Sequence, residues 1–225
     1  MNKSDVLQFV KSEGADVCGI APIERFQNCP EGYHPNDILE KTASVIVFGK
    51  KLPSSVFTAK TLSPYTLCRN ATVLLLDKIS VSLSYRIEQS GYAAVPIPAV
   101  EPYEYWDDKI PEGKGIISLR HAGELAGIGK IGKNNLLINS TYGNSLWIGA
   151  VITSLNLEGD ELSKDLCPEK CRTCLDACPQ NALNGKTVDQ MKCREVMSTY
   201  SFGGGWVFKC NRCLTACKYS NVIRK

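Results

Sequence analysis

The sequence predicts a mixed α/β (α+β) domain followed by a small cysteine-rich unit, and three observations indicate this fold class. Helix-like and strand-like patterns alternate through the first 159 residues, as in domains that pack helices on a sheet. Eight of the eleven cysteines fall at or after position 167. From residue 160 onward the apolar periodicity fades. We therefore expect an α/β domain over residues 1–159 and a second unit over residues 160–225 whose core is metal.

The elements of the first half follow from their periodicity and from the residues that end them. A helix is expected from about Ser4 to Glu13, closed by Gly14, with a buried strand in the following ADVCGIA. The β-branched run SVIVFGK (44–50) predicts an interior strand. The longest helix is expected over residues 70–89. Its apolar stripe recurs every three or four residues at Leu76, Ile79, Leu83 and Ile87.

The second half of the first domain contains a long irregular stretch. Residues 92–115 begin as a strand and continue as a loop with three clustered aromatic residues, Tyr103, Tyr105 and Trp106. Loops of this length inside a compact domain are often binding segments. A helical stretch, SLRHAGELAG, follows, and then NNLLIN and SLWIGAVITSL flank STYGN, which predicts a hairpin.

Composition and charge exclude several classes of protein. Hydrophobic content of 44% and charged content of 22% are ordinary for a globular chain. The net charge of +3 is small and scattered, and gives no strong signal for nucleic-acid binding. No export signal opens the sequence, and no apolar run reaches the roughly 20 residues of a membrane-spanning helix. We expect a cytoplasmic protein without a membrane partner, in which cysteines serve metal or catalysis instead of disulfides.

The cysteines of the second unit follow a spacing that predicts two iron-sulfur clusters. The order is C-x3-C-x2-C-x3-C-P from position 167, then a lone cysteine, then C-x2-C-x3-C from position 210. In two-cluster ferredoxins the fourth cysteine of C-x2-C-x2-C-x3-C-P ligates the other cluster. The first 4Fe-4S cluster would take Cys167, Cys171, Cys174 and Cys217. The second would take Cys178, Cys193, Cys210 and Cys213.

Zinc is the competing metal for these thiols. Four-cysteine zinc sites also use C-x2-C pairs, but they usually show two pairs separated by a spacer, not a four-cysteine run that ends in x3-C-P. Of the remaining cysteines, Cys18 lies in an apolar strand and is expected to be a core thiol. The glycine-rich GIGKIG (127–132) matches G-x-G-x-x-G, yet it follows a helical stretch and no acidic residue stands twenty positions on, so a Rossmann site is not expected.

Much of the chain resembles a known family. The resemblance is carried by HAGELAGIGKIGKNNLLINSTYGNSLWIGAVITSLNL (121–157) and the following CPEKCRTCLDACPQNAL, which are similar to epoxyqueuosine reductases and to the cofactor domain of reductive dehalogenases. It implies a nitroreductase-like α/β domain that holds cobalamin, joined to a two-cluster ferredoxin-like domain that supplies electrons. The residues that match the cofactor segment are Gly129, Ile131, Gly132, Lys133 and Asn134.

Together these features predict an iron-sulfur oxidoreductase, a reductase of the epoxyqueuosine reductase-like group. Low-potential clusters deliver single electrons, so two-electron chemistry needs an acceptor, here cobalamin with flavin as the weaker alternative, and a proton donor. The candidate donors are His121, Tyr105 and Glu112, although His121 has the alternative of a structural role in its helix. We expect a low-potential electron donor such as ferredoxin or flavodoxin, and a small-molecule or modified-nucleoside substrate.

Two other functions fit the same residues. One is a non-catalytic electron-transfer protein or subunit that docks on a redox partner, with the large domain serving recognition. The other is a zinc module that binds nucleic acid.

Overall fold

The computed structural model describes residues 1–107, 109, 112–200 and 204–221. An antiparallel four-stranded sheet, the main sheet, forms the centre, with strand order β1-β2-β8-β3. Strands β2 and β8 pair along their full lengths, from Ser44–Thr153 to Lys51–Leu146. The strands are β1 (Val17–Pro22), β2 (Ser44–Lys51), β3 (Ala94–Ile97) and β8 (Leu146–Thr153).

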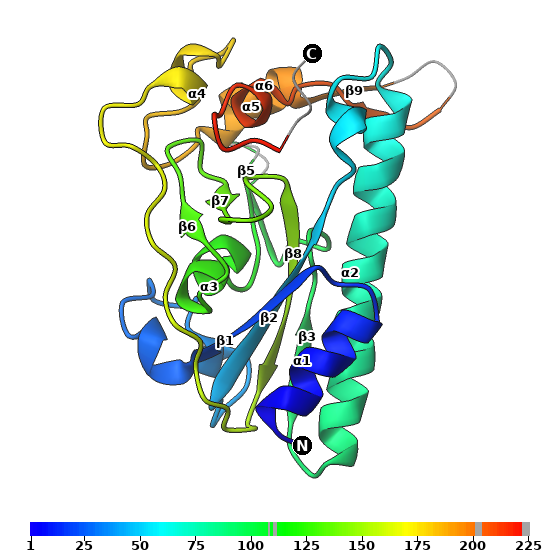
Figure 1. Ribbon diagram of the computed structural model, residues 1–225, viewed down its shortest axis with the longest axis vertical. Coiled ribbons are helices and arrows are strands. Elements are labelled where there is room, and N and C mark those ends of the chain that lie inside the picture. Colours follow the sequence, from blue (N-terminus) through cyan, green and yellow to red (C-terminus); the bar gives the residue numbers. More distant parts are fainter. Residues whose placement is uncertain (108, 110–111, 201–203, 222–225) are drawn as a thin grey trace.

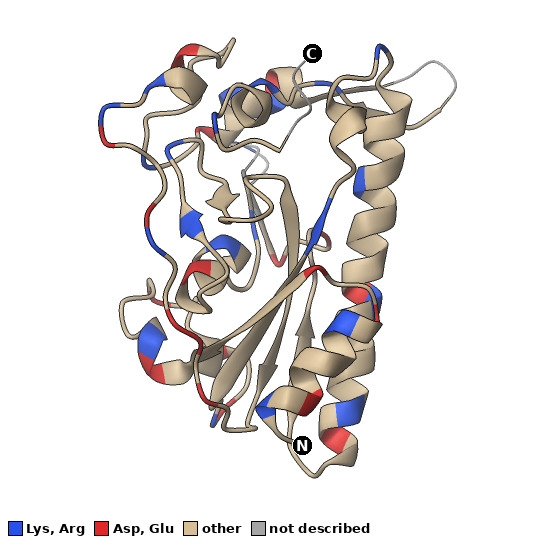
Figure 2. Ribbon diagram, in the orientation of Figure 1, with Lys and Arg blue, Asp and Glu red and all other residues tan. Residues whose placement is uncertain are grey.

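Helices cover both faces of the main sheet (Figure 1). Helices α1 (Lys3–Ser12) and α2 (Ser63–Gln89) pack on one face, and α3 (Leu119–Leu125) packs on the other. Because successive side chains of a strand point to opposite faces, Ile46 and Phe48 join the core under α1 and α2, whereas Val45 and Val47 join the core under α3. Most charged residues lie on helices and loops, and the strands carry few of them (Figure 2). The predicted α+β class is therefore observed as helices on both faces of an antiparallel sheet.

Both long helices agree with their predicted positions except at the start of α2. Asn2 caps α1, because its side chain accepts a hydrogen bond from the Asp5 backbone at 3.0 Å. Helix α2 begins seven residues before the predicted start, since Pro64 suits the first turn of a helix. None of the helices described combines the length and the apolarity needed to cross a bilayer. The predicted stripe of α2 is confirmed as fully buried at Leu76, Ile79, Leu83 and Ile87.

The predicted hairpin around STYGN is present only as a turn with one antiparallel bridge, between Asn139 and Gly143, and the flanking strands do not pair further with each other. Strand β7 (Leu137–Ile138) pairs with β6 (Lys130–Ile131) instead, and β8 joins the main sheet. The turn is tied by Asn139, whose side-chain oxygen accepts the backbone N–H groups of Thr141 and Tyr142 at 2.9 Å each. The predicted long loop also contains structure, because β4 (Tyr105–Asp107) and β5 (Glu112–Lys114) form a two-stranded ribbon.

The cysteine-rich segment comprises residues 160–225. Its first residues run along the side of the α/β half from Asp160, which contacts Lys3, and the described residues from α4 on lie across one end of the main sheet beside the start of α2 (Figure 1). Only Cys174 and Ala182 are buried among the residues described in this segment. It therefore contains very little hydrophobic core of its own. Its elements are α4 (Thr173–Asp176), α5 (Gln190–Met197), β9 (Ser198–Tyr200), β10 (Trp206–Phe208) and α6 (Arg212–Thr215). Three short 3-10 helices complete the fold: Ile23–Phe26, Pro35–Asp37 and Ser54–Phe57.

Candidate metal centre

The two cysteine motifs fold in the same way and lie side by side. Each motif contains a one-turn helix, α4 or α6, and these two helices pack against each other. A cysteine closes each turn: the Cys178 N–H donates to the Leu175 carbonyl at 3.1 Å, and the Cys217 N–H donates to the Leu214 carbonyl at 3.3 Å. The x3-C step of the sequence thus places the last thiol of each motif just beyond its helix.

The thiols of the first predicted set influence one another electrostatically. Burial is the largest cause that raises the pKa of Cys174, and the next two are the nearby thiolates of Cys167 and Cys217. Cys171 adds to the same effect. These four residues are the ones that the crossed ligand scheme assigns to one cluster, although Cys217 lies far along the chain from the other three.

The thiols of the second predicted set form a corresponding group. The pKa of Cys213 is raised to about 12, first by burial and then by the thiolates of Cys193, Cys210 and Cys178. Burial also raises the pKa of Cys193, followed by Cys210 and Cys178. Cys174 of the first set adds a smaller effect on Cys213, so the two sets adjoin.

The thiols are neighbours but do not converge on a single point. Within the described part of the chain, no three His, Cys, Asp or Glu side chains are arranged to hold one metal ion. A zinc ion binds its thiolates at about 2.3 Å and so requires them to converge closely. The described thiols therefore lie in two adjoining groups of four, and they are not gathered around one ion.

Hydrogen-bond donors of the segment point at two of the sulfur atoms. The Ala182 N–H donates to Cys178 Sγ at 3.3 Å, and Thr173 Oγ1 lies 3.5 Å from Cys171 Sγ. The bond with Thr173 is the main cause that lowers the pKa of Cys171, and Lys133 contributes less. Donors of this kind stabilise the thiolate form, which is the form that binds metal.

Lys133 and Asn134 attach the glycine-rich segment to the two cysteine motifs. The Lys133 ammonium donates to the carbonyl oxygens of Pro168 at 3.3 Å and Cys171 at 3.0 Å, and to that of Glu169. Asn134 is buried, 4% exposed, and donates through Nδ2 to the Cys213 carbonyl at 3.2 Å. Lys133 therefore fixes the first cysteine motif, and Asn134 fixes the second.

The other residues matched to the cofactor segment also contact the protein itself. A Cβ added at Gly129 would lie 2.5 Å from the Ile138 carbonyl oxygen, and one at Gly132 would lie 2.5 Å from the Ile138 side chain. The Ile131 N–H donates to the Glu124 carboxylate at 2.9 Å. Gly129 and Gly132 are therefore needed for close packing of β6 on β7. Contact of the five matched residues, Gly129 and Ile131 to Asn134, with an organic cofactor stays a prediction.

The three candidate proton donors lie on different elements. His121 is exposed on α3, and its Nδ1 lies 2.7 Å from Ser118 Oγ, which is the structural role left open by the sequence. Tyr105 is 49% exposed on β4, and its ring packs 5.8 Å from that of Tyr33. Glu112 lies in β5, where its backbone pairs with Asp107 of β4. The side chain of Glu112 lies outside the described part of the chain. Catalytic roles for these residues stay predictions.

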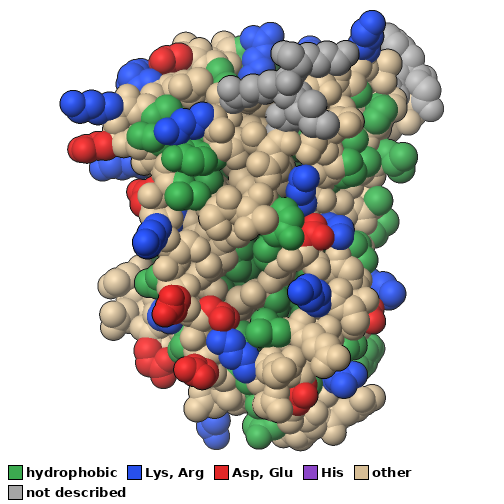
Figure 3. Space-filling model, in the orientation of Figure 1, with side chains coloured by type: hydrophobic (Ala, Val, Ile, Leu, Met, Phe, Trp, Pro, Cys, Tyr) green, Lys and Arg blue, Asp and Glu red, His purple; other side chains and the backbone are tan. Residues whose placement is uncertain are grey.

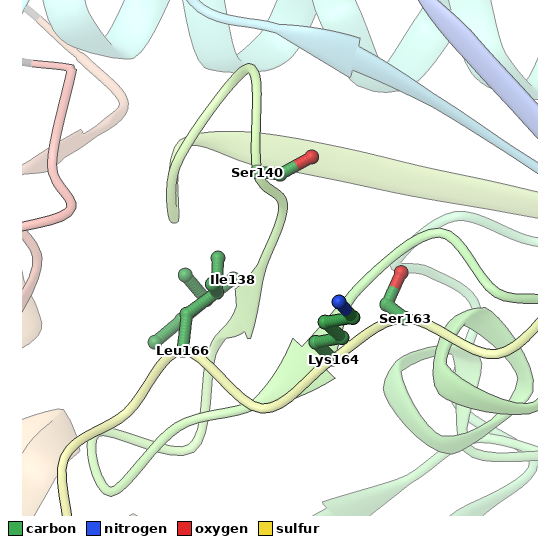
Figure 4. Close-up of a pocket in the computed structure, with 5 residues that line it drawn as sticks. All are labelled: Ile138, Ser140, Ser163, Lys164 and Leu166. Atoms are coloured by element: carbon green, nitrogen blue, oxygen red, sulfur yellow. The ribbon is translucent and has the colours of Figure 1, made fainter.

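A pocket of about 260 Å³ lies between β7 and the chain that enters the cysteine-rich segment (Figure 4). Its volume is below the roughly 300–1,000 Å³ of sites for drug-sized ligands, so this pocket does not fit a corrinoid. No sequence signal predicted it, because its lining comes from two separate stretches. The lining residues are Ile138, Ser140, Ser163, Lys164 and Leu166.

Comparison with solved structures defines the class of protein. The chain superposes with a TM-score of 0.70 on an epoxyqueuosine reductase solved with an epoxyqueuosine-modified tRNA stem loop, over 97% of this chain and 65% of that one, at 19% identity. It superposes equally well, at 0.70, on a reductive dehalogenase described as B12-dependent, over 96% of this chain and 31% of that one, at 18% identity. The fold is therefore the one that epoxyqueuosine reductases share with reductive dehalogenases.

Sequence relatives point to the first of these groups. The epoxyqueuosine reductase of Leadbetterella byssophila is 33% identical over 109 residues, which are 44% of this chain and 36% of that protein. That of Bacillus anthracis is 25% identical over 255 aligned positions, which cover 96% of this chain and 63% of that protein. No family model matches the chain. The resemblance to epoxyqueuosine reductases is confirmed in sequence and in fold, and the chain spans less than two thirds of these relatives' lengths.

Proposed function

We propose that the chain is an iron-sulfur reductase of the epoxyqueuosine reductase-like group, which passes electrons through two 4Fe-4S clusters toward an acceptor in its α/β domain. The observation that carries the proposal is the grouping of eight thiols into two adjoining sets of four. The first cluster would be held by Cys167, Cys171, Cys174 and Cys217. The second would be held by Cys178, Cys193, Cys210 and Cys213.

The small hydrophobic core of the cysteine-rich segment supports the proposal that the segment needs metal in order to fold. Small units that bury little apolar surface usually need metals or disulfides to fold, and the eight cysteines of this segment form no disulfide in the described part of the chain. The order C-x3-C-x2-C-x3-C-P favours a multi-iron cluster over zinc, whose four-cysteine sites usually show two C-x2-C pairs separated by a spacer. These residues therefore fit two clusters.

The chain's own residues would hold and tune this centre. When bound, the clusters supply single-electron transfer. The Ala182 N–H and the Thr173 hydroxyl donate toward ligand sulfurs, and Lys133 fixes the backbone of the first motif. Such contacts around the ligands orient them and set the redox potential. The proton needed by the reaction would come from Tyr105, His121 or Glu112.

Partners and substrate follow from surface charge and from the relatives. Lys and Arg side chains, with some acidic ones between them, lie at the α4 end of the face in Figure 3. Lys164, Lys170 and Arg172 are exposed in this stretch of the chain. Such basic residues favour an acidic donor protein such as ferredoxin or flavodoxin. We expect the substrate to be a small molecule or a modified nucleoside, because one solved relative binds a modified tRNA stem loop.

Cobalamin is the acceptor that the resemblance implies, and neither the pocket beside Lys164 nor the matched residues Lys133 and Asn134 fit it. The pocket beside Lys164 is too small, and Lys133 and Asn134 are engaged with the backbone of the cysteine motifs. We therefore derive no step through cobalamin. A screen of the anaerobically purified protein for corrinoid and flavin decides between an organic acceptor and the electron-carrier alternative, which predicts neither.

The metal proposal is tested by anaerobic purification with iron, sulfide and zinc analysis of the native protein and of Cys178→Ala. We expect about eight irons per chain in the native protein, since each 4Fe-4S cluster carries four. Cys178 stands in the first motif but belongs to the second set, so Cys178→Ala should lose the second cluster and retain the first. Cys29→Ala, which removes a thiol outside both sets, serves as the control and should keep all of the iron.

Three results would contradict this proposal. Zinc in place of iron would favour the zinc module, and four irons in the native protein would leave only one cluster. Equal loss or equal survival of both clusters in Cys178→Ala would reject the crossed ligand assignment.

A further inference from the structure

Arg69 lies where helix α2, the main sheet and the cysteine-rich segment meet. Its guanidinium carbon is 4.5 Å from the ring centre of Phe208 and 5.2 Å from that of Trp147. Trp147 belongs to β8, whereas Phe208 belongs to β10 and precedes the ligand candidate Cys210 by two residues. A hydrogen bond from the Phe208 N–H to Thr66 Oγ1, 2.9 Å long, fixes this part of β10 to α2. The guanidinium is thus held between rings from both halves of the molecule.

The charge of Arg69 has no acidic partner in the ranges that the structure describes. One of its terminal nitrogens donates to the neutral side-chain oxygen of Asn70 at 3.0 Å. Its Nε is buried and has no hydrogen-bond partner among the described residues. A cation that is removed from water is unfavourable unless an opposite charge lies nearby. Arg69 is therefore a half-buried cation whose contacts among the described residues are two aromatic rings and a neutral amide.

Arg69 adjoins the second set of thiols through Phe208, which lies two residues before Cys210. Tyr65 stands one helical turn before Arg69, and its ring meets that of Phe208 edge-on at 6.5 Å. Burial raises the pKa of Tyr65 to about 12, Arg69 opposes this rise, and the thiolates of Cys213 and Cys210 add to it. The pKa of Tyr65 is therefore influenced both by Arg69 and by two thiols of the second set.

We propose that Arg69 is the counter-charge of the second cluster and raises its reduction potential. This inference rests on the proposed function. Reduction adds one electron, and therefore one negative charge, to the cluster, so a nearby cation stabilises the reduced state more than the oxidised state. Because an arginine keeps its proton at all physiological pH values, the effect needs no proton transfer. Arg69 is a tuning residue, and it bonds to none of the reacting atoms.

The test is an anaerobic redox titration, followed by electron paramagnetic resonance, of native protein, Arg69→Gln, Arg69→Lys and Arg86→Gln. Arg86 is the matched control, because it lies on the same helix over the ring of Phe9 at 5.0 Å, away from the cysteines. In Arg69→Gln we expect one reduction step to become harder by about tenfold in its equilibrium constant, which is about 59 mV for one electron. The other step should not move, Arg69→Lys should stay near the native potential, and Arg86→Gln should move neither step.

Iron content separates failure of this inference from failure of the proposed function. If the native protein lacks two clusters, the proposed function fails. If native protein and Arg69→Gln both hold eight irons and no step moves, or both steps move equally, only the inference is overturned. Repeating the titration in a Cys167→Ala background, which lacks a ligand of the first set, assigns the moving step to the second cluster.

A loss of iron in Arg69→Gln does not end the test. In that case Arg69→Lys decides, because it keeps the charge but not the planar shape. Full iron and a native potential in Arg69→Lys support the role of charge, whereas loss of iron there as well overturns it.

Discussion

At the scale of single residues, Lys133 and Lys130 perform different tasks although both lie in the hairpin of β6 and β7. Lys130 makes a partly exposed ion pair with Glu124 at 2.9 Å. Lys133 instead donates to backbone carbonyls of the first cysteine motif. Exposed ion pairs contribute little to stability, whereas several backbone acceptors left without a donor are costly.

We therefore expect Lys133→Ala to lower the free energy of unfolding by about 1–3 kcal/mol. Lys130→Ala should lower it by no more than about 1 kcal/mol, because its ion pair is partly exposed. Urea unfolding of the iron-loaded proteins under anaerobic conditions measures both. Equal losses in the two variants would show that the contacts of Lys133 with the cysteine motif add no stability.

Cys18 predicts a change of stability with pH. Packing against the core under α1 and α2 confirms that it is a core thiol, and burial raises its pKa from the ordinary 9.0 to about 12, with Asp160 as the second cause. A group whose pKa is raised by folding contributes stability that is complete below its unfolded pKa and is lost as pH rises through its folded pKa. The unfolding free energy should therefore fall between pH 9 and 12 more steeply in the native protein than in Cys18→Ala. Parallel pH profiles of the two proteins in urea melts would refute this.

At the scale of elements, the turn between β7 and β8 connects the main sheet to the end of the cysteine-rich segment. Gly143 has a φ of 61°, and a Cβ there would lie 2.0 Å from the Tyr219 carbonyl oxygen. The Asn221 side chain donates to the Thr141 carbonyl at 2.8 Å in the same contact. The sequence indicates a turn at this point, but only the fold reveals that another segment packs on it.

Gly143→Ala should therefore be much more harmful than Gly91→Ala. Gly91 also has a positive φ, 86°, but nothing lies within 4 Å of its added Cβ. Both changes carry the cost of a left-handed residue, about 1 kcal/mol, and Gly143→Ala adds an overpacking cost of roughly 1–3 kcal/mol. Thermal unfolding and protease sensitivity of the cysteine-rich segment measure the difference. Equal stability of the two variants would contradict the close contact with Tyr219.

The contrast between local sequence signals and contacts made only in the fold explains which elements were predictable. The burial of Leu76 and the interior strand β2 follow from local periodicity, and both predictions are confirmed. The predicted pairing of strand β7 with β8 was wrong because an apolar run indicates a strand without naming its partner. Here Gly129 and Gly132 let β6 pack on β7, and β8 is free to pair with β2 and β3.

At the scale of the whole molecule, the two halves differ in what holds them together. The α/β half has hydrophobic cores on both faces of its sheet, whereas the described part of the cysteine-rich segment buries little besides Cys174 and Ala182. Contacts with Lys133, Asn134 and Asn144 fix this segment to the α/β half. This agrees with the proposal that metal supplies most of its internal stability.

Removal of iron should accordingly loosen one half only. After anaerobic chelation we expect fast hydrogen exchange over residues 167–217, while β2 and β8 stay protected, because metal binding and folding of the segment are linked. Hydrogen-exchange mass spectrometry before and after chelation measures this. Protection of residues 167–217 that survives complete loss of iron would show that metal does not hold the segment.

The sequence by itself determined the class of elements, the concentration of eight cysteines after position 166 and the resemblance to epoxyqueuosine reductases, because periodicity and spacing are local properties of a chain. Only the tertiary structure decided that Cys217 lies beside Cys174, that Lys133 binds the first motif and that Arg69 lies near the second set. These contacts join residues tens of positions apart, which come together only when α4 packs on α6 and the cysteine-rich segment packs on the α/β half.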